Sequence, residues 1–357
     1  MAPIRVVVVD DSTLVRGLLA EIINREPDMQ CVGAASDAFA ARELIRELDP
    51  DVITLDVEMP RMDGLDFLAR LMRLHPMPVV MVSTLTERGA QATLRALELG
   101  ADDFVAKPRI GVAGGLRSLA DELTAKLRVA ACATLHRATR PIEAVRAPHS
   151  PAPLPDAAPA DRVIFIGAST GGTEATRAVL MQLPADAPPI LITQHMPPGF
   201  TRSYAERLDR QCRIRVSEAR HGEPLRRGHA LVAPGGRQLG VERSAAGLRA
   251  RVFDGEPVNR HRPSVEVLFD SAARVVGASA IGIMLTGMGA DGATAMKAMR
   301  EAGAWNLAQD EASCVVFGMP REAIAAGAVH EVLPLEKIAA RLIERLKTAR
   351  LEALGSA

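Results

Sequence analysis

Hydrophobic and polar positions along the chain follow two alternating periods. Short apolar runs rich in Val and Ile, such as Val6–Val9, Val52–Leu55 and Ile190–Thr193, are separated by longer stretches with apolar residues every three or four positions. The short runs predict buried strands, and the longer stretches predict amphipathic helices. Strands that alternate with helices indicate β-α units around a mainly parallel sheet, so the expected fold class is α/β.

One stretch interrupts this pattern. Residues 129–161 are rich in Ala and Pro, and the apolar periodicity fades after Leu135. Repeated Pro removes backbone donors and fixes φ, which favours an extended connector over a packed element. We therefore expect two different doubly wound, mainly parallel-sheet domains, residues 1–125 and 161–350, joined by an Ala/Pro-rich linker over residues 126–160. A chain of 357 residues is long enough for both domains to bury a core.

The composition narrows the function classes. Lys and Arg together number 43 and so do Asp and Glu, so the net charge is zero and predicts no bulk attraction to nucleic acid or anionic lipid. Aromatic residues make up 3%, which argues against base-stacking surfaces. Neither a membrane-spanning apolar run nor a secretory signal is present, and the four cysteines are widely spaced. We expect a cytoplasmic protein with no nucleic-acid partner and no direct membrane insertion.

Reactive side chains follow several predicted strands of the first half. In chain order these residues are Asp10 and Asp11, Asp56, Ser83, and Lys107. The carboxyl ends of parallel strands form one crevice, where three carboxylates would repel one another without a cation. Carboxylate oxygens suit Mg²⁺, and a lysine ammonium can bind phosphoryl oxygens. One Asp after a strand is more often a helix cap or turn residue, but the ordered set predicts a phosphoryl-acceptor site.

Residues 1 to about 125 resemble a response-regulator receiver domain, and the resemblance implies a flavodoxin-like fold. It also implies Mg²⁺-dependent phosphorylation on an aspartate. The implied roles are phosphoacceptor for Asp56, acidic metal-binding pair for Asp10 and Asp11, metal-binding backbone carbonyl for Glu58, phosphoryl contact for Lys107, switch hydroxyl for Ser83 and switch aromatic for Phe104.

The second half opens with a predicted strand, Val163–Ile166, that runs into the glycine-rich segment GASTGG. A strand, a tight turn and a helix start bring backbone N–H groups to one point, where they can stabilise an anion. A phosphate loop is one possibility, although the spacing differs from both G-x-G-x-x-G and the P-loop. A nucleophile at the turn, Ser169 or Thr170, is the other. Taken alone, Ser169 is more often a helix-capping residue.

A hydroxyl nucleophile needs a base and a group that orients the base. His195 follows a predicted strand directly and should lie in the same crevice as Ser169, while His221, His229 and His261 are rival bases. Asp291 arrives on a glycine-rich loop after the predicted strand 281–285, and a helix N-cap is the alternative role for it. Ser, His and Asp at three strand ends form a credible triad, in which neutral His takes the serine proton and Asp fixes its tautomer.

Six segments of the second half resemble the chemotaxis protein-glutamate methylesterases. They are IGASTGGTEA, QHMPPGFTRSYAERL, APGGRQLGV, HRPSVEVLFDSAA, LTGMGADGATAMKAMR and AQDEASCVVFGMPREAI. The resemblance covers residues 161 to about 345 and implies a Rossmann-like fold. It implies Ser169 as nucleophile, His195 as base and Asp291 as the orienting acid. The implied substrate is the γ-glutamyl methyl ester of methyl-accepting chemotaxis receptors, which yields glutamate and methanol, and selected receptor glutamines are deamidated.

The same resemblance marks two groups for the oxyanion, Thr170 and the backbone N–H of Met288. Methionines gather near this loop at Met284, Met288, Met296 and Met299. Flexible thioether side chains commonly fill gaps in a core, so we expect these four to pack inside the domain rather than to line a binding surface.

The combination of the two domains implies control of one by the other. In the family, the unphosphorylated receiver packs over the catalytic crevice, and phosphorylation by the chemotaxis histidine kinase loosens that packing. Mg²⁺ would serve the receiver only, hydrolysis would need no cofactor, and the protein would be recruited to receptor arrays. Two other classes remain open: a nucleotide-binding module that uses GASTGG as a phosphate loop, and a response regulator whose output is protein binding alone.

Overall fold

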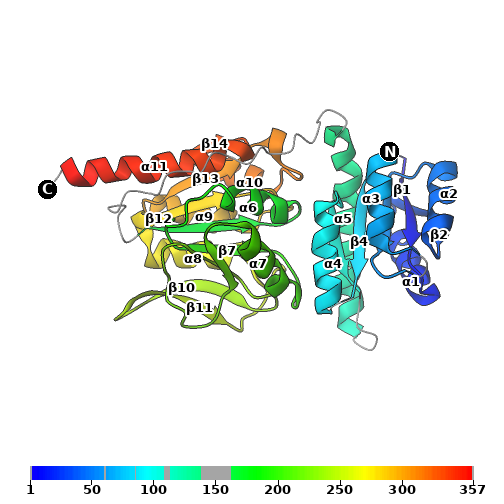
Figure 1. The fold of residues 1–357 in the computed structure, drawn as a ribbon, viewed down its shortest axis with the longest axis horizontal. Coiled ribbons are helices and arrows are strands. Elements are labelled where there is room, and N and C mark those ends of the chain that lie inside the picture. Colours follow the sequence, from blue (N-terminus) through cyan, green and yellow to red (C-terminus); the bar gives the residue numbers. More distant parts are fainter. Residues whose placement is uncertain (1, 60–61, 85, 108–112, 138–161, 356–357) are drawn as a thin grey trace. The chain divides into compact units, whose positions relative to one another are not determined.

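The chain folds into two compact α/β units, residues 1–142 and 143–357. The computed structural model describes residues 2–59, 62–84, 86–107, 113–137 and 162–355 (Figure 1). The boundary between the units lies inside the predicted linker, whose residues 138–160 are outside the described part. Among the described helices, none combines the length and the apolar character needed to cross a bilayer.

The first unit is a five-stranded parallel sheet in the order β2-β1-β3-β4-β5, which is the flavodoxin-like order. Its elements are β1 (Ile4–Val9), α1 (Thr13–Asn24), β2 (Met29–Ala35), α2 (Ala38–Leu48), β3 (Val52–Asp56), α3 (Gly64–Leu74), β4 (Val79–Ser83), α4 (Glu87–Glu98), β5 (Asp103–Ala106) and α5 (Ala113–Arg137). The strands predicted at Val6–Val9 and Val52–Leu55 are confirmed as β1 and β3, with ends shifted by two residues or fewer.

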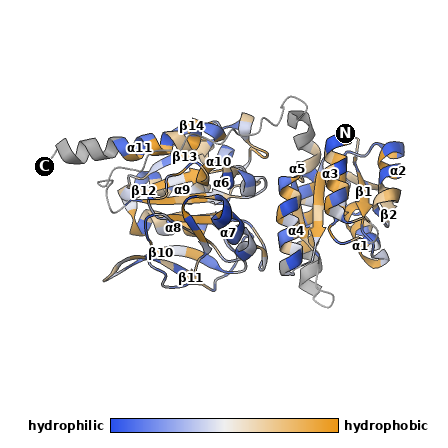
Figure 2. Ribbon diagram, in the orientation of Figure 1, coloured by the Kyte–Doolittle hydropathy of each residue, from blue (hydrophilic) through white to orange (hydrophobic). Residues whose placement is uncertain are grey.

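Alternation along β1 explains why helices cover both faces of this sheet. Val6 and Val8 are fully buried and join one core cluster with Ile23 of α1 and Leu123 of α5. Val7 lies between them and is also fully buried, on the opposite face, because successive strand side chains alternate. Figure 2 shows the strands of the two parallel sheets mainly in hydrophobic colours, with many hydrophilic residues on the surrounding helices. Burial on both faces is what a doubly wound sheet requires.

Helix α5 continues further than the sequence predicts. It runs to Arg137, and Leu127 and Ala130 are buried against the sheet. The prediction of a connector starting at residue 126 is therefore wrong for residues 126–137. Leu, Ala and Arg dominate this stretch and are strong helix formers, whereas the prolines that stop a helix begin only at Pro141.

The second unit holds a seven-stranded parallel sheet in the order β14-β13-β12-β6-β7-β9-β8, and an antiparallel hairpin of β10 and β11 that the sequence analysis did not predict. Its elements are β6 (Val163–Ala168), α6 (Gly172–Leu180), β7 (Ile190–Gln194), α7 (Phe200–Gln211), β8 (Arg215–Glu218), β9 (His229–Val232), β10 (Gln238–Ser244), β11 (Gly247–Phe253), α8 (Val265–Val275), η1 (Gly277–Ser279), β12 (Ala280–Met284), α9 (Ala293–Glu301), β13 (Trp305–Gln309), η2 (Glu311–Ser313), α10 (Met319–Ala325), β14 (Glu331–Leu333) and α11 (Leu335–Gly355).

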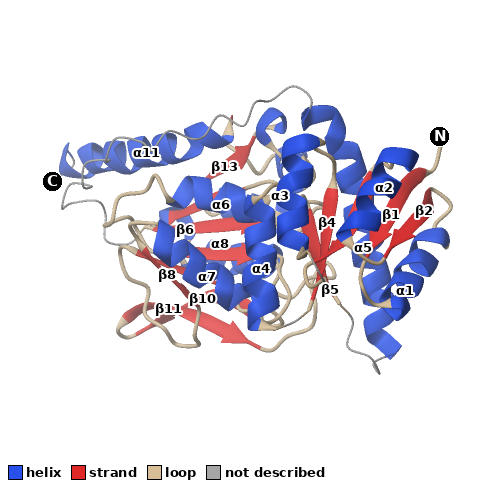
Figure 3. Cartoon of the chain, turned by 45° about the vertical axis from the view of Figure 1, so that its right-hand side comes forward, coloured by secondary structure: helices blue, strands red, loops and turns tan. Residues whose placement is uncertain are grey.

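The β6 strand carries large side chains to both faces. Phe165 belongs to the core cluster that includes Phe269 of α8 and Met296 of α9, whereas Ile164 and Ile166 are buried on the other face. Helices α6 and α7 pack against strands of this sheet, as Figure 3 shows for one side of the molecule. Because β6 has β12 on one side and β7 on the other, the loops after these three strands lie together at the carboxyl end of the sheet.

The four methionines near these loops differ in burial. Met284, Met296 and Met299 are fully buried, which confirms the expected core packing. Met288 is 39% exposed, so the expectation is wrong for this residue. The reason is its position on the loop between β12 and α9, outside the apolar face of either element.

Candidate active site and phosphoryl-acceptor site

Ser169 lies directly after β6, in a turn that its own backbone holds closed. The Ser169 N–H donates to the Thr286 carbonyl at 3.1 Å, and the Ser169 carbonyl accepts from the Gly172 N–H at 2.7 Å. Gly171 has a φ of 76°, and a Cβ there would lie 2.6 Å from Val315. Gly171, not Ser169, is the N-cap of α6, so the capping role considered for Ser169 is wrong. The Ser169 hydroxyl makes no hydrogen bond within the described part of the chain, so it is available for another use.

His195 lies beside this turn because the strands before it are paired. Ala168 and Gln194 are partners in the β6-β7 register, and the His195 N–H donates to the Ala168 carbonyl at 3.1 Å. The His195 Nε2 lies 2.8 Å from Asp291 Oδ2, with the two side chains 8% and 1% exposed. The Nδ1 atom is buried and has no hydrogen-bond partner among the described residues. Nδ1 is therefore the ring nitrogen left for a proton transfer.

Asp291 receives hydrogen bonds from several elements. Besides His195, Asn259 Nδ2 donates at 2.9 Å, Ser264 Oγ at 2.8 Å and the Val265 N–H at 2.6 Å. Burial raises the pKa of this carboxyl, but the hydrogen bonds and the charge of His195 outweigh burial and lower the pKa to about 2. The carboxylate thus faces the start of α8. The N-cap of α9 is Gly292, so the capping role considered for Asp291 at that helix is wrong.

The rival histidines have different surroundings. The His261 ring stacks on the His195 ring, with centroids 3.6 Å apart and planes 10° from parallel. His229 Nε2 lies 2.8 Å from Ser217 Oγ at the β8-β9 edge of the sheet, and His221 is exposed. Asp291 bonds to the ring of His195, so this histidine has an acid that can orient it.

The oxyanion candidates lie next to Ser169. A Cβ at Gly287 would lie 2.8 Å from the Ser169 Cβ, so the backbone that leads into Met288 passes close to the serine. The Met288 N–H makes no hydrogen bond to the described residues. Thr170 is buried, and its carbonyl accepts from Thr286 Oγ1 at 3.0 Å. The Met288 amide is thus a donor that the fold leaves unused beside Ser169.

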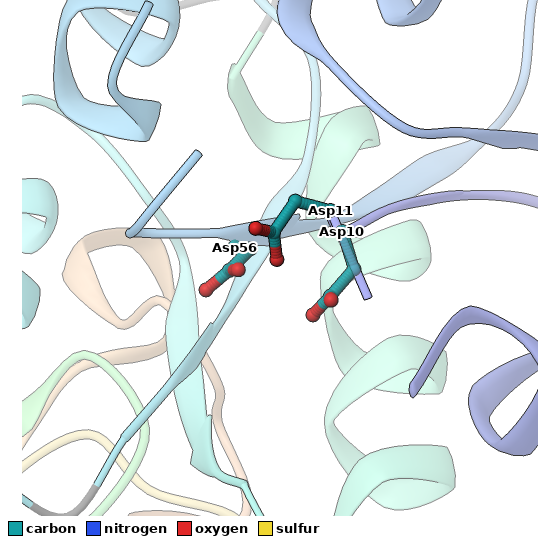
Figure 4. Close-up of side chains that lie close together, drawn as sticks. All are labelled: Asp10, Asp11 and Asp56. Atoms are coloured by element: carbon teal, nitrogen blue, oxygen red, sulfur yellow. The ribbon is translucent and has the colours of Figure 1, made fainter. Parts of the chain in front are cut away.

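The first unit gathers its reactive residues at the carboxyl ends of β1, β3 and β5. Lys107 Nζ lies 2.7 Å from Asp56 Oδ2 and 2.9 Å from Asp10 Oδ2. Carboxylate oxygens of Asp10, Asp11 and Asp56 all lie within 4.8 Å of one another (Figure 4). Asp10 and Asp56 are buried, whereas Asp11 is exposed. Three carboxylates at this spacing, one open to solvent, fit a divalent cation with oxygen ligands.

Two opposing effects set the pKa of the Asp56 carboxyl. Burial raises the pKa of this carboxyl to about 6, and Lys107 lowers it only in part. The Glu58 N–H donates to Asp56 Oδ1 at 3.3 Å. A Cβ at Gly64 would lie 2.0 Å from the Asp56 carbonyl oxygen, so only glycine allows α3 to start this close to the site.

The two switch candidates lie on neighbouring strands. Ser83, at the end of β4, is buried and its hydroxyl donates to the Gly89 carbonyl in α4 at 3.2 Å. Phe104 on β5 is buried, and Lys126 Nζ lies 5.1 Å from the centre of its ring. The hydroxyl that would meet a phosphoryl group on Asp56 is thus bonded to the first turn of α4.

The sequence did not indicate three polar residues that bond to Ser169 or Asp291. Gln194 donates to the Ser169 carbonyl, and Asn259 and Ser264 hold Asp291. Gln194 and Ser264 belong to segments, QHMPPG and HRPSVE, that stood out in the sequence, whereas Asn259 had no comparable signal.

Comparisons with known proteins agree with this geometry. Residues 164–342 match the CheB methylesterase family, and residues 6–111 match the response regulator receiver domain. The chain is 62% identical to the protein-glutamate methylesterase/protein-glutamine glutaminase 1 of Albidiferax ferrireducens, over 97% of this chain and 95% of that protein. It is 56% identical to the corresponding protein of Nitrosomonas europaea, over 99% of both.

A solved structure matches the second unit. The CheB methylesterase catalytic domain of Thermotoga maritima has a TM-score of 0.50 and 38% identity, and the match covers 51% of this chain and 97% of that domain. The match of the family model to half the chain and the full-length relatives lead to the same conclusion. The chain belongs to the CheB methylesterase family, with a response regulator receiver domain ahead of the methylesterase domain.

Proposed function

We propose that this chain hydrolyses γ-glutamyl methyl esters of methyl-accepting chemotaxis receptors, releases methanol, and deamidates selected receptor glutamines to glutamate. Relatives that match nearly its full length are named protein-glutamate methylesterase/protein-glutamine glutaminase. The observation that carries the proposal is the 2.8 Å bond between His195 Nε2 and Asp291, which leaves a buried Nδ1 without a described partner, on a residue whose backbone N–H bonds to Ala168 directly before Ser169.

The hydrogen bond between His195 and Asp291 supports a specific direction of proton transfer. Asp291, with a pKa of about 2, is ionised at neutral pH and accepts the Nε2–H of His195. The lone pair then resides on Nδ1, which takes the Ser169 proton as Oγ bonds to the ester carbonyl carbon. The N–H of Met288 and the peptide N–H of Thr170 hold the oxyanion. Collapse of the tetrahedral intermediate breaks the C–O bond to the methoxy group, which leaves as methanol with the proton from Nδ1.

The second half of the cycle uses the same groups. Water gives its proton to Nδ1 and attacks the glutamyl-Ser169 ester, and Ser169 leaves with the proton returned. With a glutamine substrate, ammonia leaves in place of methanol in the first half, and the second half is unchanged. One acyl-enzyme therefore accounts for both activities.

We propose that Asp56 accepts a phosphoryl group from the chemotaxis histidine kinase and that this raises the rate of hydrolysis. Mg²⁺ would be held by Asp10, Asp11, Asp56 and the Glu58 carbonyl, and it supplies positive charge that offsets the negative charge of the phosphoryl oxygens. The short contacts of Lys107 to Asp10 and Asp56 support its role as the phosphoryl-contacting cation. Ser83 would exchange its bond to Gly89 for one to the phosphoryl group, with Phe104 following.

The proposal includes the organisation of the chain and its place in the cell. The receiver would extend beyond residue 125 to Arg137, where α5 ends, the linker would cover residues 138–160, and the catalytic domain residues 161–350. The protein would act in the cytoplasm and be recruited to receptor arrays, where its substrates and its kinase lie.

Methanol release from methyl-labelled receptor membranes tests the proposal. Wild type should release methanol, faster with acetyl phosphate and Mg²⁺, and Ser169→Ala should release none while its receiver is still phosphorylated. Asp56→Ala should keep basal hydrolysis and lose the stimulation. Normal output from Ser169→Ala would favour a protein-binding regulator, and tight ADP or NAD binding would favour a nucleotide module. Equal stimulation of Asp56→Ala and wild type would refute receiver control.

A further inference from the structure

The side chain of Gln194 bridges the turns that carry Ser169 and His195. Gln194 is the last residue of β7 and is 3% exposed. Its Nε2 donates to the Ser169 carbonyl at 2.8 Å and to the His195 carbonyl at 3.3 Å. Both partners are acceptors, and the two N–H hydrogens of the Gln194 amide allow one bond to each.

The bond from Gln194 to the Ser169 carbonyl holds the Ser169–Thr170 peptide, whose N–H the proposed mechanism uses. The Ser169 carbonyl accepts from both the Gly172 N–H and the Gln194 side chain. This carbonyl and the Thr170 N–H belong to one planar trans peptide, in which they point in opposite directions. Fixing the carbonyl therefore fixes the direction of the Thr170 N–H.

The amide of Gln194 has little room to move. A Cβ at Gly172 would lie 2.3 Å from Gln194 Oε1, so the glycine provides the space that the amide occupies. Oε1 is buried and has no hydrogen-bond partner among the described residues. The reverse orientation would place Oε1 against two carbonyl oxygens, which is repulsive. The surroundings thus favour one orientation of the amide.

We propose that Gln194 is a positioning residue for hydrolysis: it holds the Ser169–Thr170 peptide so that the Thr170 N–H meets the oxyanion. This rests on the proposed function, because the oxyanion forms only if Ser169 is the nucleophile. Without the amide, the Ser169 carbonyl keeps the Gly172 bond alone, and the peptide can rotate away from the geometry that the transition state needs.

Two variants of the full chain test the proposal. Gln194→Met keeps the length of the side chain and removes both N–H donors, and Gln194→Glu places a carboxyl group in the same space. Gln182→Met is the matched control, because the side chain of Gln182, two residues after the end of α6, bonds only to the Ala178 carbonyl among the described residues. Methanol release gives kcat and KM, and calorimetry shows whether each variant is folded.

Gln194→Met should lower kcat about 10–100-fold with KM within about twofold, because the weakened contact, from the Thr170 N–H to the oxyanion, is made only in the transition state. Gln182→Met should match wild type. In Gln194→Glu the introduced carboxyl can donate one hydrogen bond only when protonated, so its activity relative to wild type should rise as pH falls. The ratio for Gln194→Met should not depend on pH.

A folded Gln194→Met variant with wild-type kcat would refute the positioning role. So would a crystal structure of that variant with the Ser169–Thr170 peptide in its original orientation, whatever the activity. Failure of the proposed function itself has a different signature: Ser169→Ala would release methanol as fast as wild type, or wild type would release none, and the positioning role would then fall with it.

Discussion

At the scale of single residues, the Asp291 carboxylate is held in place by several hydrogen bonds. Donors from His195, Asn259, Ser264 and Val265 converge on its two oxygens. Burial alone would raise the pKa of a carboxyl, yet that of Asp291 is lowered to about 2. The site therefore maintains an anion, and an anion next to His195 would stabilise the imidazolium of the proposed proton transfer.

Replacing Asp291 with Asn should abolish most of the activity without removing the hydrogen bond. An Asn amide can donate to Nε2, which shifts the His195 proton to Nδ1, the atom that must accept from Ser169. The kcat for methanol release should fall about 10³–10⁴-fold. The control is Ser217→Ala, which removes the hydroxyl partner of His229 and should leave kcat within about twofold. Near-normal release by Asp291→Asn would contradict the assignment.

Asp56 makes the stability of the receiver depend on pH in the opposite sense to a usual carboxylate. Its pKa is about 6 in the folded protein against an ordinary 3.8, so between these values the folded state binds more protons than the unfolded state. The free energy of unfolding should fall by up to about 3 kcal/mol as pH rises from about 4 to about 6, at about 1.4 kcal/mol per pH unit.

Asp56→Asn should remove this dependence and be the more stable protein at pH 7. Calorimetry of the full chain from pH 4 to 7 measures the effect. Glu47→Gln, a change on the exposed side of α2, should retain the wild-type slope. Equal slopes for Asp56→Asn and wild type would show that another group is responsible.

The residues differ in how far sequence could locate them. Ser169, His195 and Asp56 follow apolar runs directly, and the geometry of a parallel sheet brings such positions together. Asn259 and Ser264 bond to Asp291 across 32 and 27 residues. They lie in an irregular segment without periodicity, so nothing local indicates which of its polar side chains turns inward.

At the scale of elements, the turn between β6 and α6 depends on the backbone of Gly171. An alanine there would take a left-handed conformation and meet Val315, so the turn should shift and move Ser169. Gly171→Ala should lower kcat about tenfold or more, because a displacement of about 1 Å can cost about 10²-fold. Gly327→Ala has a similar φ and open space around it, so it should lose stability alone. Equal kcat values for the two variants would overturn the prediction.

The central elements were predictable and the peripheral ones were not. Fully apolar runs predict β1, β3, β6, β7 and β12 because these strands are buried on both faces. The hairpin of β10 and β11 was missed because charged residues interrupt its apolar positions, as in Val241-Glu242-Arg243. Helix α5 was cut short in the prediction because alanines, which pack against the sheet here, also occur in linkers.

At the scale of the whole molecule, two units with separate cores should unfold in two calorimetric transitions. Mg²⁺ at about ten times its Kd should raise the receiver transition by about 5 °C and leave the other unchanged. Asp11→Asn should reduce this shift, because it removes an exposed ligand that does not contact Lys107, and EDTA should reverse it. An equal Mg²⁺ effect on both transitions would mean that the ion binds elsewhere as well.

The central position of β6 among the seven strands has a consequence for how the enzyme loses activity on heating. The three loops that carry Ser169, His195 and Asp291 all follow central strands, with β8 and β14 at the outer edges. Edge strands fray first, whereas central strands exchange their amide hydrogens only when the whole domain opens. Warming should therefore leave the esterase fully competent until the domain melts, so the loss of activity and the loss of the last protected amides in β6 should coincide.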